Sequence, residues 1–321
     1  MTRRSTLAPA GWPAVLRRAE EIANEIISTG LRPTLRSIFY RLSSEGLLVH
    51  SQTAYKKLSE KFARYREERQ IISILEDRTR YEVGTNTREP QNILDYIRLQ
   101  INFLLRRLEE DVWKVPKWHQ QRSYVEIFVE KDALADLLSN IAYEEEVLVF
   151  VTRGFSSITK LYEASLRLKE FADRGNEIVV LTLTDFDPSG LEIENDYKAK
   201  LEKYGVSAKF HRIALKPEQI SKYDLPAIPE DDPSYARIKR DPRFQKWKKY
   251  CEEHRIEPKP VELDAFVGLR PQEFKNEVIS AIRKYFDENI YREVKKIEEE
   301  RRKLAKQYVD LIRNYFREIL M

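Results

Sequence analysis

The stretch EIVVLTLTDFDPSGLE, residues 177–192, decides the fold of this chain. Residues 178–183 are a continuous apolar run rich in β-branched side chains, which is typical of a strand covered on both faces, as in a parallel sheet. Asp185 and Asp187 follow this strand, and residues 188–190 lead into a helical pattern. Open parallel sheets bind ligands just beyond the carboxyl ends of their strands. The stretch therefore predicts an α/β domain with a ligand site near the two aspartates.

Asp185 and Asp187 allow two interpretations. Carboxylates one residue apart can point into one crevice and offer the hard oxygen ligands that Mg²⁺ prefers. Asp187 before Pro188 is also a common helix start, with Asp as the N-cap and Pro at the first helical position. The motif is too short to decide between a metal site and a helix cap by itself.

Strands and helices alternate on both sides of this stretch. Strands are predicted at residues 124–129, 147–151, 178–183 and 209–214, and helices at 132–143, 156–172 and 188–203. This succession predicts a parallel sheet with helices on both faces. We expect a further edge strand at residues 261–267 and closing helices at residues 276–286 and 288–319.

A third acid strengthens the metal interpretation. Glu130 follows the first predicted strand, so it meets Asp185 and Asp187 at one edge if the first and third strands are neighbours. Three carboxylates together repel one another unless a cation lies between them, which predicts Mg²⁺. Gly154 follows the second strand and allows a backbone to approach the same edge closely.

The N-terminal part is helical and basic. Helical spacing at residues 12–28, 34–45 and 51–70, followed by a β-like stretch at 71–75, predicts a helix-turn-helix or winged-helix module. A solvated charged surface is the alternative interpretation of its basic third helix. The residues of that helix expected to contact DNA are Lys56, Lys57, Lys61 and Arg64.

Tyr40 and Arg36 lie outside the apolar stripe of the second helix. At about 100° per residue, they share the side opposite that stripe. A guanidinium beside a tyrosine can bind a phosphate or stabilise a phenolate. The alternative is a partly exposed tyrosine that covers apolar surface. The stripe itself consists of Leu35, Ile38, Phe39 and Leu42.

Composition sets the broad class. The 321 residues suffice for two domains, and the net charge of +4 is a mild indication of an acidic partner. The single cysteine, Cys251, excludes an internal disulfide and fits a reducing compartment. With no signal peptide and no apolar run of about 18 residues, we expect a cytoplasmic protein without a membrane partner. Abundant Lys, Arg and Glu beside two Met favour a thermophilic source.

Two separated groups of motifs resemble one family. TLRSIFY (residues 34–40), followed by VEKDAL (129–134), TRGFSS (152–157) and TDFDPSG (184–190), resembles the A subunit of type IIB topoisomerases (topoisomerase VI) and the meiotic double-strand-break transesterases. The chain is most similar to short stand-alone forms called Mini-A, over roughly residues 30–270. The resemblance implies a winged-helix domain (1–85), a linker and helix (86–121), a Toprim domain (122–270) and C-terminal helices (271–321).

The resemblance also implies a chemistry. Tyr40 would attack double-stranded DNA to give a 5′-phosphotyrosyl link, and Arg36 would place the phosphate. Glu130, Asp185 and Asp187 would hold Mg²⁺, with Glu130 also transferring a proton at the 3′ oxygen. The family is a group of DNA strand-breaking isomerases in which the tyrosine of one subunit works with the acids of the other. A homodimer in the prokaryotic nucleoid is therefore expected.

The chain departs from the family pattern in three places. The common Tyr-Tyr pair is Phe39-Tyr40, and Ser37 replaces an acid. No G-x-x-x-x-G-K-[ST] loop is present, so ATP gating would need a separate B-type ATPase subunit. Two other functions stay open: a Toprim metal-dependent nuclease in which water attacks, and a DNA-binding or bridging protein without chemistry.

Overall fold

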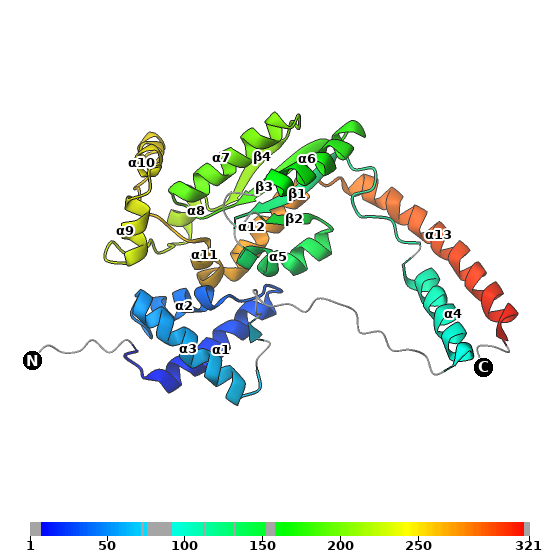
Figure 1. The fold of residues 1–321 in the computed structure, drawn as a ribbon, viewed down its shortest axis with the longest axis horizontal. Helices are drawn as coiled ribbons and strands as arrows, with labels where there is room; N and C mark the ends of the chain where they lie inside the picture. The colour runs from blue at the N-terminus through cyan, green and yellow to red at the C-terminus, as the bar shows by residue number, and fades with distance from the viewer. Residues whose placement is uncertain are drawn as a thin grey trace, which may run out of the picture. The chain divides into compact units, whose positions relative to one another are not determined.

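The structure, a computed structural model, describes residues 8–71, 74–75, 92–111, 113–130, 132–151 and 158–317. The chain divides into two compact units (Figure 1). The first unit comprises Met1–Arg78 and Ser123–Tyr285, and the second comprises Thr79–Arg122 and Phe286–Met321. The predicted C-terminal helices are therefore divided between the units, one in each.

The first unit contains a parallel sheet of four strands in the order β2-β1-β3-β4. β1 and β3 pair along their whole length, from Ser123 opposite Glu177 to Val129 opposite Leu183. The predictions of a mixed α/β fold and of neighbouring first and third strands are therefore confirmed. The strands are β1 (Ser123–Val129), β2 (Leu148–Val151), β3 (Glu177–Leu183) and β4 (Lys209–Ala214).

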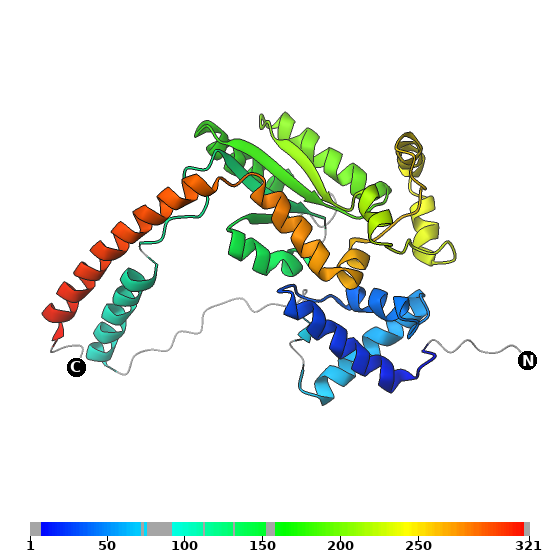
Figure 2. The ribbon, with the colours of Figure 1, turned by 180° about the vertical axis from the view of Figure 1, so that it is seen from behind.

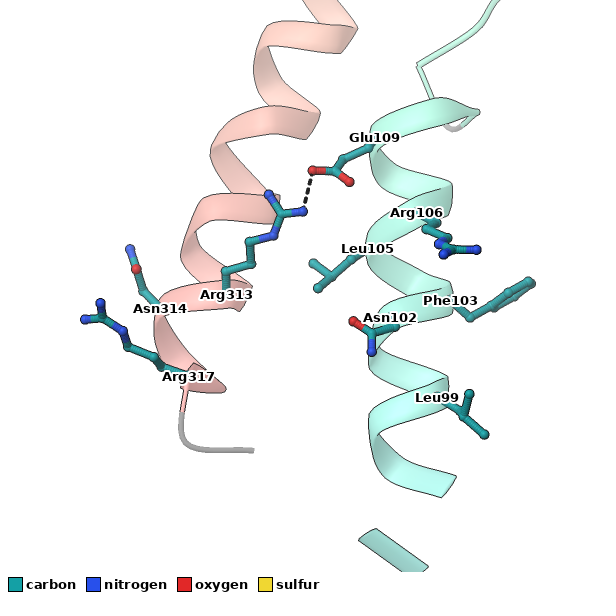
Figure 3. A pocket seen from close by; sticks show the side chains of 9 residues that line it. All are labelled: Leu99, Asn102, Phe103, Leu105, Arg106, Glu109, Arg313, Asn314 and Arg317. Carbon is teal, nitrogen blue, oxygen red and sulfur yellow. Dashed lines mark ion pairs between the residues drawn. The ribbon is translucent and has the colours of Figure 1, made fainter. Parts of the chain in front are cut away.

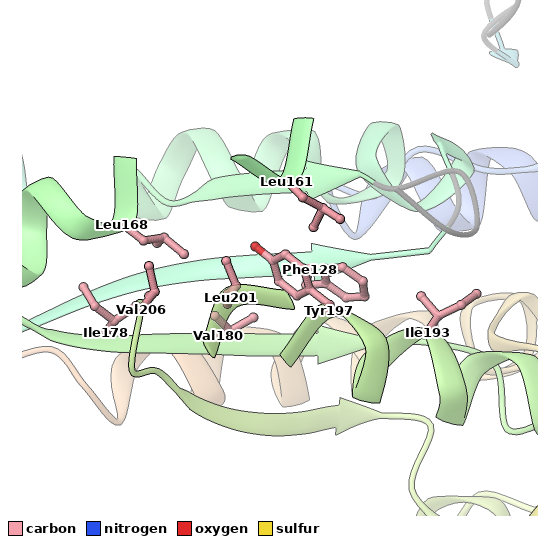
Figure 4. Packing of buried hydrophobic residues seen from close by; sticks show 9 residues of the cluster. All are labelled: Phe128, Leu161, Leu168, Ile178, Val180, Ile193, Tyr197, Leu201 and Val206. Atoms are coloured by element: carbon pink, nitrogen blue, oxygen red, sulfur yellow. The ribbon is translucent and has the colours of Figure 1, made fainter. Parts of the chain in front are cut away.

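Helices cover both faces of this sheet (Figures 1 and 2). α6 (Ile158–Asp173) and α7 (Pro188–Lys203) lie on one face, and α5 (Asp132–Glu145) and α12 (Pro271–Arg283) lie on the other. Figure 4 shows the core beneath α6 and α7, where Phe128 of β1 stacks on Tyr197 of α7 with ring centroids 4.3 Å apart. The other members of this cluster are Leu161, Leu168, Ile178, Val180, Ile193, Leu201 and Val206.

Three helices form the N-terminal part of the first unit: α1 (Trp12–Ser28), α2 (Leu35–Ser44) and α3 (Gln52–Glu68). Thr34 caps α2 in a capping box with Ser37, because each side chain accepts a hydrogen bond from the other residue's backbone N–H. The described residues between 8 and 75 contain no strand. The β-like prediction is therefore wrong for Ile71, Ile74 and Leu75, while residues 72–73 lie outside the described part.

The predicted edge strand at residues 261–267 is wrong. Only Val261 pairs, through an antiparallel bridge to Phe186, and α11 (Leu263–Leu269) begins directly afterwards. Apolar residues alternate with Glu262 and Asp264 at the start of this stretch, which fits a strand, but a run this short also fits a helix. The structure makes it a helix in which residues 263–268 are buried.

Three short helices complete the first unit after β4. They are α8 (Pro217–Lys222), α9 (Pro233–Lys239) and α10 (Phe244–Glu253). Trp247 of α10 packs on Phe186, with ring centroids 5.6 Å apart, and Cys251 of the same helix is buried. The aromatic contact anchors α10 beside the segment that follows β3, and the burial fits a structural role for Cys251.

The second unit is built on two helices that lie side by side, α4 (Ile93–Glu110) and α13 (Glu288–Tyr315). Glu109 and Arg313 form an ion pair of 2.7 Å across them, above a groove between the helices (Figure 3). In α4 only Leu105 is buried, so most of its apolar side chains are exposed. Among the described residues, no helix combines the length and apolar character needed to cross a bilayer.

A buried acid lies in the middle of β1. Glu126 is fully buried, and the Arg167 guanidinium of α6 donates to both of its carboxylate oxygens at 2.9 and 3.0 Å. The Tyr124 hydroxyl is 3.4 Å from the same carboxylate. Burial raises the pKa of Glu126 to about 7, and the charge of Arg167 opposes this shift. Desolvation therefore raises the pKa of Glu126 by more than the ion pair with Arg167 lowers it.

We expect Glu126 to make stability pH-dependent. Its folded pKa of about 7 lies above the unfolded value of about 4.3, so the protonated form favours the folded state. This stabilisation is present below about pH 4 and is lost as the pH rises through about 7, at a cost of about 4 kcal/mol. In urea unfolding from about pH 4 to about pH 8, Glu126→Gln should remove this decline, and the exposed Glu163→Gln should keep it. Parallel profiles for wild type and Glu126→Gln would contradict the prediction.

Candidate functional site

Glu130, Asp185 and Asp187 lie at the carboxyl edge of the sheet. Glu130 follows β1 directly, and the two aspartates follow β3, whose last residue is paired with the last residue of β1. β2 lies on one side of β1, β3 and β4 lie on the other, and the crossover helices α5 and α6 are on opposite faces. The gap between β1 and β3 is thus a topological switch point, where open α/β sheets bind ligands.

Each aspartate also has a structural task. Asp185 is buried, and its Oδ1 accepts a hydrogen bond of 3.0 Å from the backbone N–H of Leu263. Asp187 is the N-cap of α7, and its Oδ1 accepts from the backbone N–H of Gly190 at 2.7 Å. A Cβ on Gly190 would lie 2.3 Å from the carbonyl oxygen of Asp185. Only glycine therefore lets α7 begin this close to the end of β3.

The three carboxylates do not form a closed metal cage. In the part of the chain that the structure describes, no three His, Cys, Asp or Glu side chains gather closely enough to hold a metal ion. The donor chemistry nevertheless fits Mg²⁺, which commonly binds one or two carboxylates and completes its shell with water and substrate phosphates. Gly154, predicted to line this edge, lies outside the described residues.

Arg36 and Tyr40 of α2 converge on one carboxylate, that of Glu262. The Tyr40 hydroxyl donates to Oε2 at 3.0 Å. Arg36 donates to the same oxygen through Nε at 2.7 Å and to Oε1 through Nη2 at 2.6 Å. The prediction that Arg36 and Tyr40 share one side of the helix is confirmed. The alternative of a partly exposed tyrosine is wrong, because α11 packs against α2 and leaves Tyr40 only 1% exposed.

The environment of Tyr40 keeps its hydroxyl protonated. Burial raises the pKa of Tyr40 well above 10, and the negative charge of Glu262 raises it further. Burial acts to lower the pKa of Arg36, but hydrogen bonds to Glu262 and its charge outweigh that effect and raise it. In this arrangement Arg36 is a permanent cation and Tyr40 is a neutral hydrogen-bond donor.

Residues 261–264, which we call the linking segment, join α2 to the sheet edge. Val261 exchanges backbone hydrogen bonds of 2.9 and 3.1 Å with Phe186. The Glu262 carboxylate accepts a hydrogen bond from Tyr40 of α2, and the backbone N–H of Leu263 donates to Asp185. The Asp264 carboxylate accepts a hydrogen bond of 2.7 Å from the Thr34 hydroxyl. Tyr40 and Asp185 of the same chain therefore contact adjacent residues of one segment.

The predicted DNA-binding residues of α3 share an exposed surface. Lys56, Lys57, Lys61 and Arg64 are all exposed. Arg64 pairs with Glu60 at 3.2 Å, and the ammonium of Lys61 lies 5.4 Å from the ring centre of Trp12. Exposed pairs of this kind are weak and leave the cations available to an anionic partner.

Two residues of the site are absent from the sequence prediction. Glu262 lies 222 positions from Tyr40, and no spacing rule connects charges at that distance. His50 packs its ring against the edge of Tyr40 with centroids 5.2 Å apart, and burial lowers its pKa. A signal existed only for Glu262, because it is a charged residue in a mostly apolar stretch, residues 261–269.

Comparison of the chain with protein-family models, with curated protein sequences and with solved structures gave no match. The function must therefore be inferred from the residues and their geometry. Two features carry that inference: the acids at the switch point, and the pair Arg36 and Tyr40 held by the linking segment.

Gly268 sets the distance between α2 and α11. A Cβ at this position would lie 2.2 Å from the carbonyl oxygen of Ser37. We expect Gly268→Ala to push the two helices apart and to lower the free energy of unfolding by about 1–3 kcal/mol. Urea unfolding measures this loss, with Ser44→Ala at the exposed end of α2 as the control. A Gly268→Ala protein as stable as the control would show that the contact is unimportant.

Proposed function

We propose that this chain is a Mg²⁺-dependent, DNA-cleaving transesterase of the topoisomerase VI A-subunit type, with Tyr40 as the nucleophile. One observation carries the proposal: the Arg36 guanidinium and the Tyr40 hydroxyl bind the same anionic group, Glu262, and the next residue, Leu263, binds Asp185. A guanidinium fork and a phenol on one oxyanion are the groups needed to hold and attack a phosphodiester.

In the proposed reaction, the Tyr40 hydroxyl oxygen forms a bond to phosphorus while the bond from phosphorus to the 3′ oxygen breaks. The phenol proton passes to solvent water, and Glu130, which follows β1 at the sheet edge, would deliver a proton to the departing 3′ oxygen. The products are a 5′-phosphotyrosyl link and a free 3′-hydroxyl. Arg36 stabilises the charge on the phosphate. Mg²⁺ held by Glu130, Asp185 and Asp187 would neutralise further charge there.

The proposal assigns a role to each part of the chain. Residues 1–85 would be a winged-helix domain that binds double-stranded DNA along α3, and residues 122–270 a Toprim domain. A homodimer would bring the tyrosine of one subunit to the acids of the other, and a separate B-type ATPase would supply any ATP gating. Exposed apolar side chains on α4 support a protein partner, because such patches commonly mark interfaces. They include Ile93, Leu94, Leu99 and Phe103.

A specific observation favours a second candidate, a Toprim metal-dependent nuclease. Tyr40 is buried, and its pKa is raised, so the hydroxyl is neither accessible nor activated in this arrangement. In a nuclease, water would attack the phosphate and Tyr40 would only pack between α2 and α11. The acids at the switch point serve both reactions equally well.

The nucleophile is tested with Tyr40→Phe on supercoiled DNA with Mg²⁺ and a denaturing stop. We expect wild type to become attached to 5′ DNA ends and Tyr40→Phe to attach more than about a thousandfold less. Tyr65→Phe is the matched control, because the Tyr65 hydroxyl also donates to a glutamate, Glu20, at 2.8 Å. It should attach like wild type.

The other outcomes identify the alternatives. If Tyr40→Phe cuts DNA normally while Asp185→Ala does not, the protein is a metal-dependent nuclease. If no variant cuts, and DNA binding depends on salt but not on chelation or on Tyr40, the protein binds DNA without chemistry. Attachment that survives in Tyr40→Phe would assign the nucleophile to another residue.

The basic face of α3 is tested through salt dependence. Each phosphate contact contributes about 0.9 to the slope of log affinity against log salt. We expect Lys56→Gln, Lys57→Gln and Lys61→Gln each to lower this slope by up to about 0.9, measured by duplex DNA titration. Lys249→Gln, at a lysine of α10 whose side chain is 77% exposed, is the control. Slopes equal to the control would show that α3 does not contact DNA.

A further inference from the structure

We propose that Glu262 is an internal stand-in for the DNA phosphate, occupying its place between Arg36 and Tyr40 until DNA displaces it. This inference rests on the proposed function, and it adds a positioning residue and a mode of control to the same site. Glu262 would keep the nucleophile covered in the absence of DNA and would release it only when a phosphate takes over its hydrogen bonds.

The hydrogen bonds match those of a phosphate complex. Arg36 uses two nitrogens, at 2.7 and 2.6 Å, on the two oxygens of Glu262, and this fork geometry serves carboxylates and phosphates alike. The Tyr40 hydroxyl donates to one of the same oxygens at 3.0 Å. An anion that approached Arg36 and Tyr40 would therefore meet donors already engaged by Glu262.

Burial and charge indicate that a phosphate replaces Glu262 at Arg36 rather than binding beside it. Tyr40 is 1% exposed, and the side chains of Arg36 and Glu262 are 27% and 13% exposed. An anion can therefore reach Arg36 from solvent but cannot reach the Tyr40 hydroxyl while Glu262 covers it. A phosphate added beside Glu262 would place two anions on one guanidinium, and like charges at this distance repel. The phosphate must replace Glu262.

The backbone allows such an exchange. Glu262 is the residue before α11, and its side chain makes no capping hydrogen bond to that helix. Its neighbours are fixed, since Val261 pairs with Phe186 and Leu263 donates to Asp185. The Glu262 side chain can therefore turn away without unfolding α11 or moving the sheet edge.

The test is the affinity of Glu262→Gln for a short duplex DNA in chelator, so that no cleavage occurs. Glutamine keeps the shape but cannot hold Arg36 as an anion, so we expect binding tighter by about fivefold or more. Glu257→Gln is the matched control, because Glu257 also pairs with a cation, Lys259 at 2.9 Å, but is exposed. It removes the same charge without opening the site.

Affinity of Glu262→Gln equal to or weaker than that of Glu257→Gln overturns the inference. Tight binding together with loss of DNA attachment in Mg²⁺ also overturns it, because Glu262 would then be the base that deprotonates Tyr40. If Glu262→Gln binds DNA more tightly but the wild-type protein never becomes attached to DNA, the proposed function is wrong, while the inference that DNA displaces Glu262 stands.

A second measurement, on the wild-type protein, tests the inference if Glu262→Gln does not fold. The side-chain Nε–H resonance of Arg36 in the wild-type protein, assigned with Arg36→Lys, is followed during titration with the same duplex. We expect it to shift as phosphate replaces Glu262. An unmoved resonance at saturating DNA overturns the inference.

Discussion

The linking segment, residues 261–264, is the constraint on which the candidate site depends. Its hydrogen bonds reach the end of β3 on one side and α2 on the other. Because Glu262 uses its side chain and Leu263 uses its backbone N–H, one short stretch can hold both Tyr40 and Asp185. The close approach of Gly268 to Ser37 then fixes the helix that follows. These contacts join α2 to the segment that follows β3.

Glu262, Arg36 and Tyr40 act as one electrostatic unit. A buried phenol needs a hydrogen-bond acceptor, and a largely buried carboxylate needs a cation. Glu262 accepts hydrogen bonds from both Arg36 and Tyr40, so removing Glu262 takes away an acceptor that these two donors share. The same arrangement that stabilises the fold also suppresses the reactivity of Tyr40, since burial and Glu262 raise its pKa. The contacts that bury Tyr40 are therefore the same ones that disfavour its phenolate form.

Local pattern explains why much of the fold is predictable from sequence. The apolar run at residues 178–183 identifies a doubly covered strand, and Thr34 and Asp187 mark helix starts by capping chemistry that operates within a few residues. The strand prediction for residues 261–267 is wrong because so short a stretch fits the spacing of a strand and of a helix. For the site, adjacency of β1 and β3 brought Glu130 and the aspartates to one edge as expected. The described structure shows no cluster of three such side chains close enough to hold a metal, and the positions of side chains at an edge are not encoded by a local pattern.

The sequence by itself determined the parallel α/β domain, the three N-terminal helices, and the pairing of Arg36 with Tyr40 on one side of α2. These follow from periodicity and spacing within one element. Only the tertiary structure decided that Tyr40 is buried and that Glu262 holds both residues. Contacts between residues more than two hundred positions apart arise from packing of α11 on α2, and helical periodicity shows which side of α2 is free but not what covers it.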